Sequence, residues 1–130
     1  MDQNNWGGVL FYFRNHLEIH QITVSSATKE DLWLELIVKS EKLLVGCIYR
    51  PPNDKKFFQQ FRMVLENIGH RANILILGDF NVDLSKVYSI SNDFKHMLHA
   101  MNLTNIIKKD TRITDKSKTL IDLALSLIHI

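Results

Sequence analysis

The chain has 130 residues, of which 45% are hydrophobic and 23% are charged. This composition fits one compact globular domain and excludes a disordered chain, because disorder requires low hydrophobicity and a high net charge. The formal net charge is only +2, so a site for a polyanion must come from the local placement of Lys and Arg side chains.

The cysteine content and the apolar runs indicate in which cellular compartment the protein is expected. Cys47 is the single cysteine, so an internal disulfide is excluded. It lies in the apolar run LLVGCIY, which fits a reducing compartment or a plain buried thiol. No apolar run approaches the roughly 20 residues that span a bilayer, and the start MDQNNWGG lacks the features of a secretory signal. We therefore expect a soluble intracellular protein with no membrane partner.

The first half of the chain has the pattern of strands. Short runs rich in β-branched and aromatic residues are separated by polar turns, which predicts an antiparallel meander of four strands. The expected strands are GGVLFYFR (7–14), LEIHQITV (17–24), LWLELIV (32–38) and LLVGCIY (43–49).

After Pro51 and Pro52 the apolar residues take the period of a helix. Asn53 or Asp54 is placed to cap its first turn. A strand, ANILIL (72–77), and a second helix from about Asn92 follow, and NLTNII (102–107) and TLIDLAL (119–125) close the chain as strands. This mixture predicts an α/β layered domain. The expected buried stripes are Phe57, Phe61, Val64, Leu65 and Ile68 on the first helix, and Phe94, Met97, Leu98 and Met101 on the second.

A polar pair follows the most apolar strand, in the stretch ILILGDFNVD (74–83). Because successive side chains of a strand point to opposite faces, Asp79 and Asn81 are expected to face the same way while Phe80 turns toward the core. Ordinary turn chemistry is the alternative explanation, since Gly, Asp and Asn are common turn residues.

Other polar residues of interest also lie at strand ends. Tyr49 and Arg50 finish the run LLVGCIYR, and Asp122 lies within an apolar strand, where a carboxylate needs a partner. Asp122 could instead be a buried acid paired with a structural arginine, and Tyr49 could be an ordinary core aromatic.

Four segments together resemble a known family. YRPPN (49–53), LGDFNVDL (77–84), TRIT (111–114) and SKTLIDLAL (117–125), in that order, resemble the endonuclease/exonuclease/phosphatase superfamily. Within it they look most like the apurinic-type endonuclease domain of non-LTR retrotransposons, in which GGVLFYFR resembles the strand after the first acidic motif. The resemblance implies a two-sheet β-sandwich flanked by helices, the four-layer DNase-like fold, with residues 1–124 as the central part of one domain that is incomplete at both ends.

The resemblance also implies roles for single residues. Asp79 would orient or deprotonate the attacking water, and Asn81 would donate a hydrogen bond to the scissile phosphate. Tyr49 would contact the phosphate, and Asp122 would hold a catalytic histidine in its useful tautomer. The residues expected to contact DNA are Arg50, Asn53, Thr111 and Arg112.

The sequence departs from the family in two places. The family has a metal-binding glutamate on a strand before GGV and a Ser-Asp-His strand after IDL, and neither motif occurs here. We therefore assign no metal ligand in this chain, expect Mg²⁺ only in the complete domain, and expect the chain alone to be inactive. His129 lies too close to Asp122 to be the catalytic histidine. Two histidine pairs, His16 with His20 and His96 with His99, lack a third metal ligand and are expected at the surface.

Both ends of the chain carry unusual features. The segment LSLIHI (125–130) resembles one translated frame of an adapter used in sequencing libraries, so we expect it to be an artefactual tail. Met1 stands where the family is already past its first catalytic strands, which indicates a gene model cut from a longer element.

Three functions are open from the sequence. The first is a fragment of a Mg²⁺-dependent endonuclease that nicks target DNA for reverse transcription, with DNA and a reverse transcriptase domain of the same polyprotein as partners and a nuclear location. The second is a lipid or inositol-phosphate phosphodiesterase of the same superfamily. The third is an inert product or a non-catalytic DNA-binding remnant.

Overall fold

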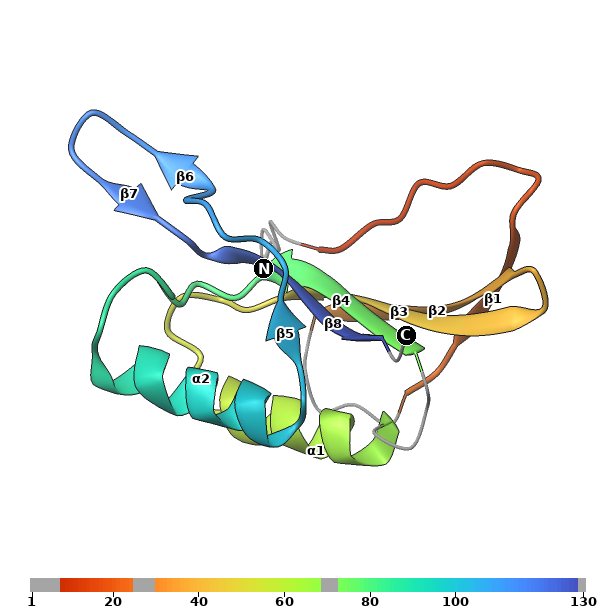
Figure 1. Cartoon of the computed structure of the whole chain (residues 1–130), viewed down its shortest axis with the longest axis horizontal. Helices are drawn as coiled ribbons and strands as arrows, with labels where there is room; N and C mark the ends of the chain where they lie inside the picture. The colour runs from red at the N-terminus through yellow and green to blue at the C-terminus, as the bar shows by residue number, and fades with distance from the viewer. Residues whose placement is uncertain (1–7, 25–29, 69–72, 129–130) are drawn as a thin grey trace, which may run out of the picture.

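The computed structural model describes residues 8–24, 30–68 and 73–128 and has a mixed α/β fold. A six-stranded sheet has the order β1-β2-β3-β4-β8-β5, and β6 and β7 form a small second sheet. Both helices lie on one face of the large sheet, and the β6–β7 hairpin projects away from it (Figure 1). The elements are β1 (Glu18–Ile22), β2 (Asp31–Val38), β3 (Glu41–Tyr49), α1 (Phe57–Ile68), β4 (Asn73–Asp79), α2 (Ser89–Ala100), β5 (Thr104–Asn105), β6 (Arg112–Ile113), β7 (Lys118–Thr119) and β8 (Asp122–Ile128).

The strand connections follow from the turns in the sequence. β1, β2 and β3 pair antiparallel as a meander, which the alternation of apolar runs and polar turns predicted. β3 and β4 pair parallel, and the connection between them contains α1, as a parallel pair requires a long crossover. β8 then pairs antiparallel with β4, so β4 lies inside the sheet between β3, which ends at Tyr49, and β8, which begins at Asp122.

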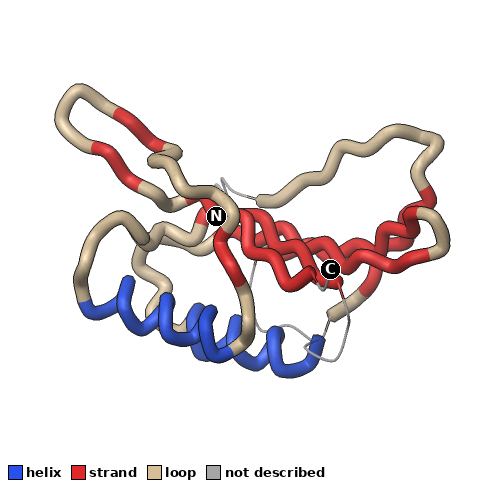
Figure 2. Tube along the Cα trace, in the orientation of Figure 1, coloured by secondary structure: helices blue, strands red, loops and turns tan. Residues whose placement is uncertain are grey.

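The prediction of a strand at residues 7–14 is wrong for the part that the structure describes. Residues 8–14 form no strand, and Figure 2 shows them as a loop on the side of the sheet opposite the helices. Leu10 is 65% exposed and Tyr12 is 91% exposed. A strand needs a neighbour that accepts and donates its backbone hydrogen bonds. Within the described sheet β1 pairs with β2 alone, so residues 8–14 have no neighbouring strand with which to pair.

Both predicted helices are present. On α2 the expected residues Phe94 and Leu98 are buried. Met97 and Met101 are only partly buried against the core, and Met101 lies just after the helix. All five residues of the stripe expected on α1 are buried. The backbone N–H of Lys56 donates to Asp54 Oδ1 at 3.0 Å, so Asp54 is the acceptor that precedes the first turn. The helix α2 begins at Ser89, earlier than the expected start near Asn92.

An aromatic cluster joins the helices to the sheet. The ring of Phe80 lies 5.9 Å from Phe57, 5.4 Å from Phe61 and 5.4 Å from Phe94. Phe80 has no exposed surface, which confirms that it turns toward the core. The residue directly after the central strand β4 is therefore anchored between both helices, and this fixes where the following loop starts.

The face of the sheet opposite the helices carries the polar strand ends. Ile48, Gly78 and Leu123 are in register across β3, β4 and β8, and Ile48 and Leu123 are buried on the helix side. Side chains one residue away point to the other face, where Leu77 is 36% exposed. Cys47 is half-buried there, and burial raises the pKa of its thiol, an effect that a hydrogen bond with the backbone of Leu10 opposes.

Gly78 is required by the packing of β3 against β4. A Cβ atom at this position would lie 2.0 Å from the backbone oxygen of Ile48, which no side chain tolerates. The glycine before Asp79 therefore lets the two parallel strands approach closely at the end that carries the candidate site.

Residues 125–128 belong to the last strand of the sheet. Leu125 pairs with Ile76 and Ser126 pairs with Leu75, and Leu125 is fully buried. The origin of the segment 125–130 stays a prediction, and residues 129–130 lie outside the described part of the chain. No helix in the described ranges is long and apolar enough to cross a membrane.

Candidate functional site

Three of the predicted site residues form a row across three neighbouring strands. The row consists of Tyr49, Asp79 and Asp122 and is called the carboxylate row below. Tyr49 is the register partner of Asp79, and Asp79 is the register partner of Asp122. Register partners point to the same face of a sheet, so the phenol and the two carboxylates lie side by side on the face opposite the helices. All three residues are half-buried, as expected for groups that meet a ligand at the surface.

Asn81 joins this row through a turn that begins where β4 ends. Its backbone N–H donates to Asp79 Oδ1 at 2.9 Å, and its side-chain Nδ2 donates to the backbone oxygen of Arg50 at 2.6 Å. The φ angle of Asn81 is 48°, in the left-handed region that Asn tolerates better than most residues. Asp79 and Asn81 are therefore neighbours because of a tight turn, and strand alternation, on which the sequence argument relied, ends at Asp79.

The hairpin residues Thr111 and Arg112 reach the same row. The Nη2 atom of Arg112 lies 3.6 Å from Asp79 Oδ2, and the Thr111 hydroxyl accepts a hydrogen bond of 3.2 Å from the backbone N–H of Asp122. Thr111 and Arg112 are both exposed. The TRIT segment thus brings one cation and one hydroxyl to the edge of the carboxylate row.

The loop after β4 is held to the segment that precedes β8. Phe80 N donates to Ile121 O at 3.0 Å, and Leu84 N donates to Leu120 O at 3.0 Å. Between them, the buried carboxylate of Asp83 accepts hydrogen bonds at Oδ1 from the backbone N–H of Leu120, at 3.0 Å, and from both the N–H and the hydroxyl of Ser85. This cross-link sets the relative position of Asn81 and Asp122.

Asp83 is a positioning residue that the sequence argument missed. Its spacing to Ser85 is a usable signal, because Asp followed two residues later by a donor is typical of a side-chain-capped turn. Burial acts to raise the pKa of Asp83, but hydrogen bonds from Ser85 and Leu120 and the charge of Lys86 outweigh that effect, so the pKa lies below its ordinary value. The carboxylate is therefore ionised in the folded protein at neutral pH.

Two residues expected to contact DNA have different surroundings. Arg50 is 4% exposed, and its side chain donates to the backbone oxygens of Asp54, Phe80 and Asn81. Asn53 is exposed in the turn between β3 and α1, and among the described residues no hydrogen bond joins it to the carboxylate row. The structure thus brings Tyr49, Asp79, Asn81, Asp122, Thr111 and Arg112 together, whereas Arg50 lies beneath them and Asn53 lies apart.

The described residues do not assemble the set of ligands that a metal ion needs. No group of three or more His, Cys, Asp or Glu side chains within residues 8–24, 30–68 and 73–128 is placed to hold a metal ion. His20 is exposed and lies 3.3 Å from Glu18, while His96 and His99 are exposed on α2. The surface position predicted for these histidines is confirmed.

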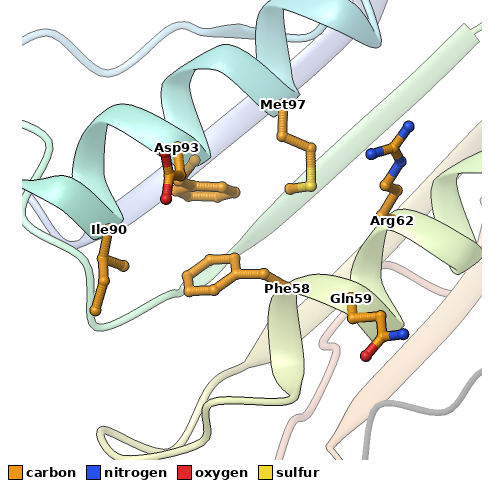
Figure 3. Close-up of a pocket in the computed structure, with 7 residues that line it drawn as sticks. Phe58, Gln59, Arg62, Ile90, Asp93 and Met97 are labelled. Atoms are coloured by element: carbon orange, nitrogen blue, oxygen red, sulfur yellow. The ribbon is translucent and has the colours of Figure 1, made fainter.

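A separate pocket lies between the two helices, as Figure 3 shows. Its volume is about 360 Å³, and apolar side chains line most of it. None of the predicted site residues contributes to its wall, so this concavity is distinct from the carboxylate row. The lining residues are Phe58, Gln59, Arg62, Ile90, Asp93, Phe94 and Met97.

The central strand β4 thus ends at the carboxylate of Asp79, the turn after it carries the carboxamide of Asn81, and Tyr49 and Asp122 lie on the neighbouring strands. The chain belongs to the endonuclease-reverse transcriptase family, whose sequence profile matches residues 43–128. The match contains Tyr49, Asp79, Asn81 and Asp122, and it excludes β1 and β2. A comparison with curated proteins found no match.

Solved structures with the same fold come from several enzymes. The endonuclease domain of TRAS1, a telomere-specific non-LTR retrotransposon, is 14% identical with a TM-score of 0.66, covering 87% of this chain and 57% of that domain. Sphingomyelinase C from Streptomyces griseocarneus is 17% identical with a TM-score of 0.56, covering 83% of this chain and 48% of that protein. An endonuclease/exonuclease/phosphatase family protein from Leptotrichia buccalis is 14% identical with a TM-score of 0.54, covering 86% and 49%. The chain thus spans about half the length of these proteins, and they show its fold.

Proposed function

We propose that this chain supplies the phosphate-contacting part of a phosphodiesterase site that nicks DNA for reverse transcription. The observation that supports the proposal is the row of Tyr49, Asp79 and Asp122, with Asn81 hydrogen-bonded to Asp79. Hydrolysis of a phosphodiester needs an oriented water on one side and hydrogen-bond donors where charge builds up on the phosphoryl oxygens. A carboxylate beside a carboxamide supplies one group of each kind.

Each of these four residues has a separate task. Asp79 accepts a proton from the attacking water or orients it, and Asn81 donates an amide N–H to a phosphate oxygen. An amide nitrogen carries two hydrogens, so the bond from Asn81 to the backbone oxygen of Arg50 leaves one for the ligand. Tyr49 donates its phenol to the phosphate, and Asp122 is suited to orient an imidazole.

The hairpin gives the site its preference for a phosphate backbone. Arg112 sits beside Asp79 and is 59% exposed, so a phosphate can replace the carboxylate as its partner at little cost. Thr111 is positioned by its bond to the backbone of Asp122. Contacts of this type fix the register of a protein on DNA without reading sequence. Further exposed cations near or on the hairpin are Lys108, Lys109, Lys116 and Lys118.

Mg²⁺ is part of the proposed reaction only in the complete domain. The carboxylates of Asp79 and Asp122 lie in one row, but the described residues do not assemble three acidic or histidine ligands, and they do not fit a complete metal site. The tasks given above therefore involve only side chains of this chain. The family's metal-binding glutamate and catalytic histidine have no counterpart in the sequence, so we expect the 130-residue chain to bind DNA without nicking it.

A lipid phosphodiesterase is the second candidate, because sphingomyelinase C has the same fold. The exposed basic hairpin favours DNA, since an extended polyanion contacts several cations at once while a single headgroup contacts one or two. We also keep the possibility of a DNA-binding remnant without catalysis, which shares the binding step and lacks the chemical one.

Binding measurements on the purified chain test the proposal. We expect fluorescence anisotropy to show salt-dependent binding to a short DNA duplex, weakened by Asn81→Ala and Arg112→Ala and unchanged by Arg62→Ala, an exposed arginine of α1 paired with Glu66. Vesicles containing sphingomyelin form the competing arm of the experiment. Binding to vesicles and not to DNA would replace the proposal with the lipid alternative.

Nicking of supercoiled plasmid with Mg²⁺ tests the chemical step. A domain that also contains the glutamate and Ser-Asp-His strands should nick, and Asp79→Asn or Asn81→Ala should lower its rate about 100-fold or more. If neither variant changes the rate of nicking, the roles assigned to Asp79 and Asn81 are wrong. If the 130-residue chain itself nicks, the expectation that nicking needs the family's metal-binding glutamate and catalytic histidine is wrong.

A further inference from the structure

Arg50 has the surroundings of an internal support and not those of a ligand-binding cation. Its exposed fraction is 4%, whereas the side chain of Arg112 is 59% exposed. A buried charge is tolerated only where hydrogen bonds replace its lost hydration. The Arg50 guanidinium meets this requirement with four bonds, each to a backbone carbonyl of the same domain.

Those four bonds connect the segment that precedes α1 with the turn after β4. Nε and Nη2 of Arg50 donate to Asp54 O at 3.2 and 3.0 Å, and Nη1 donates to Phe80 O at 3.3 Å and to Asn81 O at 3.2 Å. The guanidinium carbon also lies 4.7 Å from the ring centre of Phe58, within the range of a cation–π contact. Burial lowers the pKa of Arg50, and electrostatic interactions with Asp54 and Tyr88 oppose that lowering.

The contact between Arg50 and Asn81 is reciprocal. The Arg50 side chain donates to the backbone oxygen of Asn81, while the Asn81 side chain donates to the backbone oxygen of Arg50. The Arg50 backbone N–H in turn donates to Asp79 O at 2.9 Å. Asn81 has a left-handed φ of 48°, a conformation that persists in a non-glycine residue only where neighbours hold it.

The ring beneath the guanidinium is itself fixed. Phe58 lies 5.4 Å from Phe57 and 5.0 Å from Phe94, between ring centres. Figure 3 shows Phe58 extending from α1 toward α2, where it forms part of the wall of the pocket between the helices. Arg50 therefore rests on an aromatic surface that both helices hold in place.

We infer that Arg50 is a positioning residue that fixes the Asp79–Asn81 turn from below and aims the Asn81 amide, and that it makes no contact with phosphate. The planar fork of an arginine is required, because its five N–H groups reach Asp54 O and both loop carbonyls together, which the single nitrogen of a lysine cannot do. The effect on DNA binding rests on the proposed function, whereas the effect on Asn81 does not.

The first test uses the unaltered chain, so it does not depend on whether a variant folds. In ¹⁵N-labelled protein, hydrogen exchange of the Arg50 Nε–H should be at least about tenfold slower than that of the Arg62 Nε–H. Arg62 Nε donates only to the exposed carboxylate of Glu66, and Arg62 is 67% exposed, so water reaches this donor easily. Equal exchange rates would mean that the guanidinium is open to solvent, and the inference would be wrong.

The second test compares Arg50→Lys with the matched control Arg62→Lys, at a temperature where circular dichroism shows both to be folded. Arg50→Lys should shift the Asn81 side-chain amide resonances and weaken binding of a short DNA duplex about tenfold, and the control should do neither. Unmoved Asn81 resonances would overturn the inference even if DNA binding fell. If the unaltered chain binds no DNA, the proposed function fails while the resonances still decide the inference.

A double-mutant cycle separates positioning from a general loss of stability. If Arg50 acts through Asn81, Arg50→Lys should weaken DNA binding less than twofold in an Asn81→Ala background, because the group it positions is already absent. The same tenfold loss in both backgrounds would show that Arg50 acts independently of Asn81, and would overturn the inference.

Discussion

The turn after β4 and the β6–β7 hairpin both contribute to the candidate site, but they are built in opposite ways. The turn lies against the core through Phe80. Its polar groups are held because the Arg50 side chain donates to Phe80 O and the Leu120 backbone N–H donates to the Asp83 carboxylate. On the hairpin, the strand residues of β6 are exposed, and those of β7 are exposed or half-buried.

The difference corresponds to two requirements of the proposed nuclease site. Groups that meet the reacting phosphate must already have the right geometry, because a misplacement of about 1 Å is costly in rate. For groups that contact the rest of the DNA backbone, charge and reach are more important than rigidity. Changes in the turn should therefore affect folding and chemistry together, while changes in the hairpin should affect binding alone.

The largest effect is expected from Gly78→Ala, in the strand that leads into the turn. The added Cβ would lie 2.0 Å from the backbone oxygen of Ile48, so β3 and β4 must separate where Tyr49 and Asp79 pair. We expect the free energy of unfolding to fall by about 3 kcal/mol or more. Urea denaturation of the variant and the unaltered chain measures the change.

The matched comparison for Gly78→Ala is Ser117→Ala, an exposed position of the hairpin. It should change the free energy of unfolding by no more than about 0.5 kcal/mol. If both substitutions cost the same, the contrast between a packed turn and an open hairpin would not describe this protein.

The second prediction concerns Asp83, which cross-links the turn to the segment before β8. Asp83→Ala leaves the backbone N–H of Leu120 without its acceptor at Oδ1, and an unsatisfied buried donor costs about 1–3 kcal/mol. We expect a loss of about 2 kcal/mol in the free energy of unfolding, measured by urea denaturation.

Asp83 also predicts how stability depends on pH. Because the pKa of Asp83 is lower in the folded protein than its ordinary value, the carboxylate stabilises the fold above its unfolded pKa of about 3.9, and this stabilisation is lost as the pH falls through the lower folded pKa. Asp83→Asn should therefore flatten the fall in stability below about pH 4. The exposed Asp115→Asn is the control, and an equal flattening by both would contradict the assignment.

The sequence predicted those parts of the fold that depend on local pattern. Apolar periodicity located both helices and the strands β1 to β4, and the order of four motifs identified the family before any contact was known. The strand predicted at residues 7–14 failed because a strand also needs a partner, and no pattern within eight residues reveals one.

The candidate site likewise has parts that follow from local motifs and parts that depend on contacts between distant segments. Tyr49, Asp79, Asn81 and Asp122 could be named from their motifs. The adjacency of Tyr49, Asp79 and Asp122 follows from strand register, whereas Asn81 lies beside Asp79 through the turn after β4. The placement of Arg50 could not be predicted, because two of its acceptors, Phe80 O and Asn81 O, are 30 and 31 residues away in the chain. The link from Asp83 to Leu120 spans 37 residues, and only the tertiary fold creates it.

The third prediction concerns Arg112, where the two regions meet. The ion pair of Arg112 with Asp79 has an N–O distance of 3.6 Å and a largely exposed arginine, so Arg112→Ala should change the free energy of unfolding by no more than about 0.5 kcal/mol. DNA affinity at low salt should fall several-fold, because one phosphate contact is lost. A large loss of stability with unchanged binding would reverse the roles of turn and hairpin.

The smallest effect is expected from Lys116→Ala, at the exposed turn of the hairpin between β6 and β7. A lysine that neutralises one phosphate releases the counterions of that phosphate, so its removal should reduce the slope of log K against log salt by about 0.9 and weaken binding equally for all sequences. Lys42→Ala is the matched control, since Lys42 pairs with Glu35 at 3.3 Å and lies near the end of β3 opposite to Tyr49. Anisotropy titrations from 50 to 200 mM salt, an interval chosen because roughly this range resolves such slopes, give both values. An equal change of slope in the two variants would mean that the DNA contact is diffuse and that the hairpin has no special part in it.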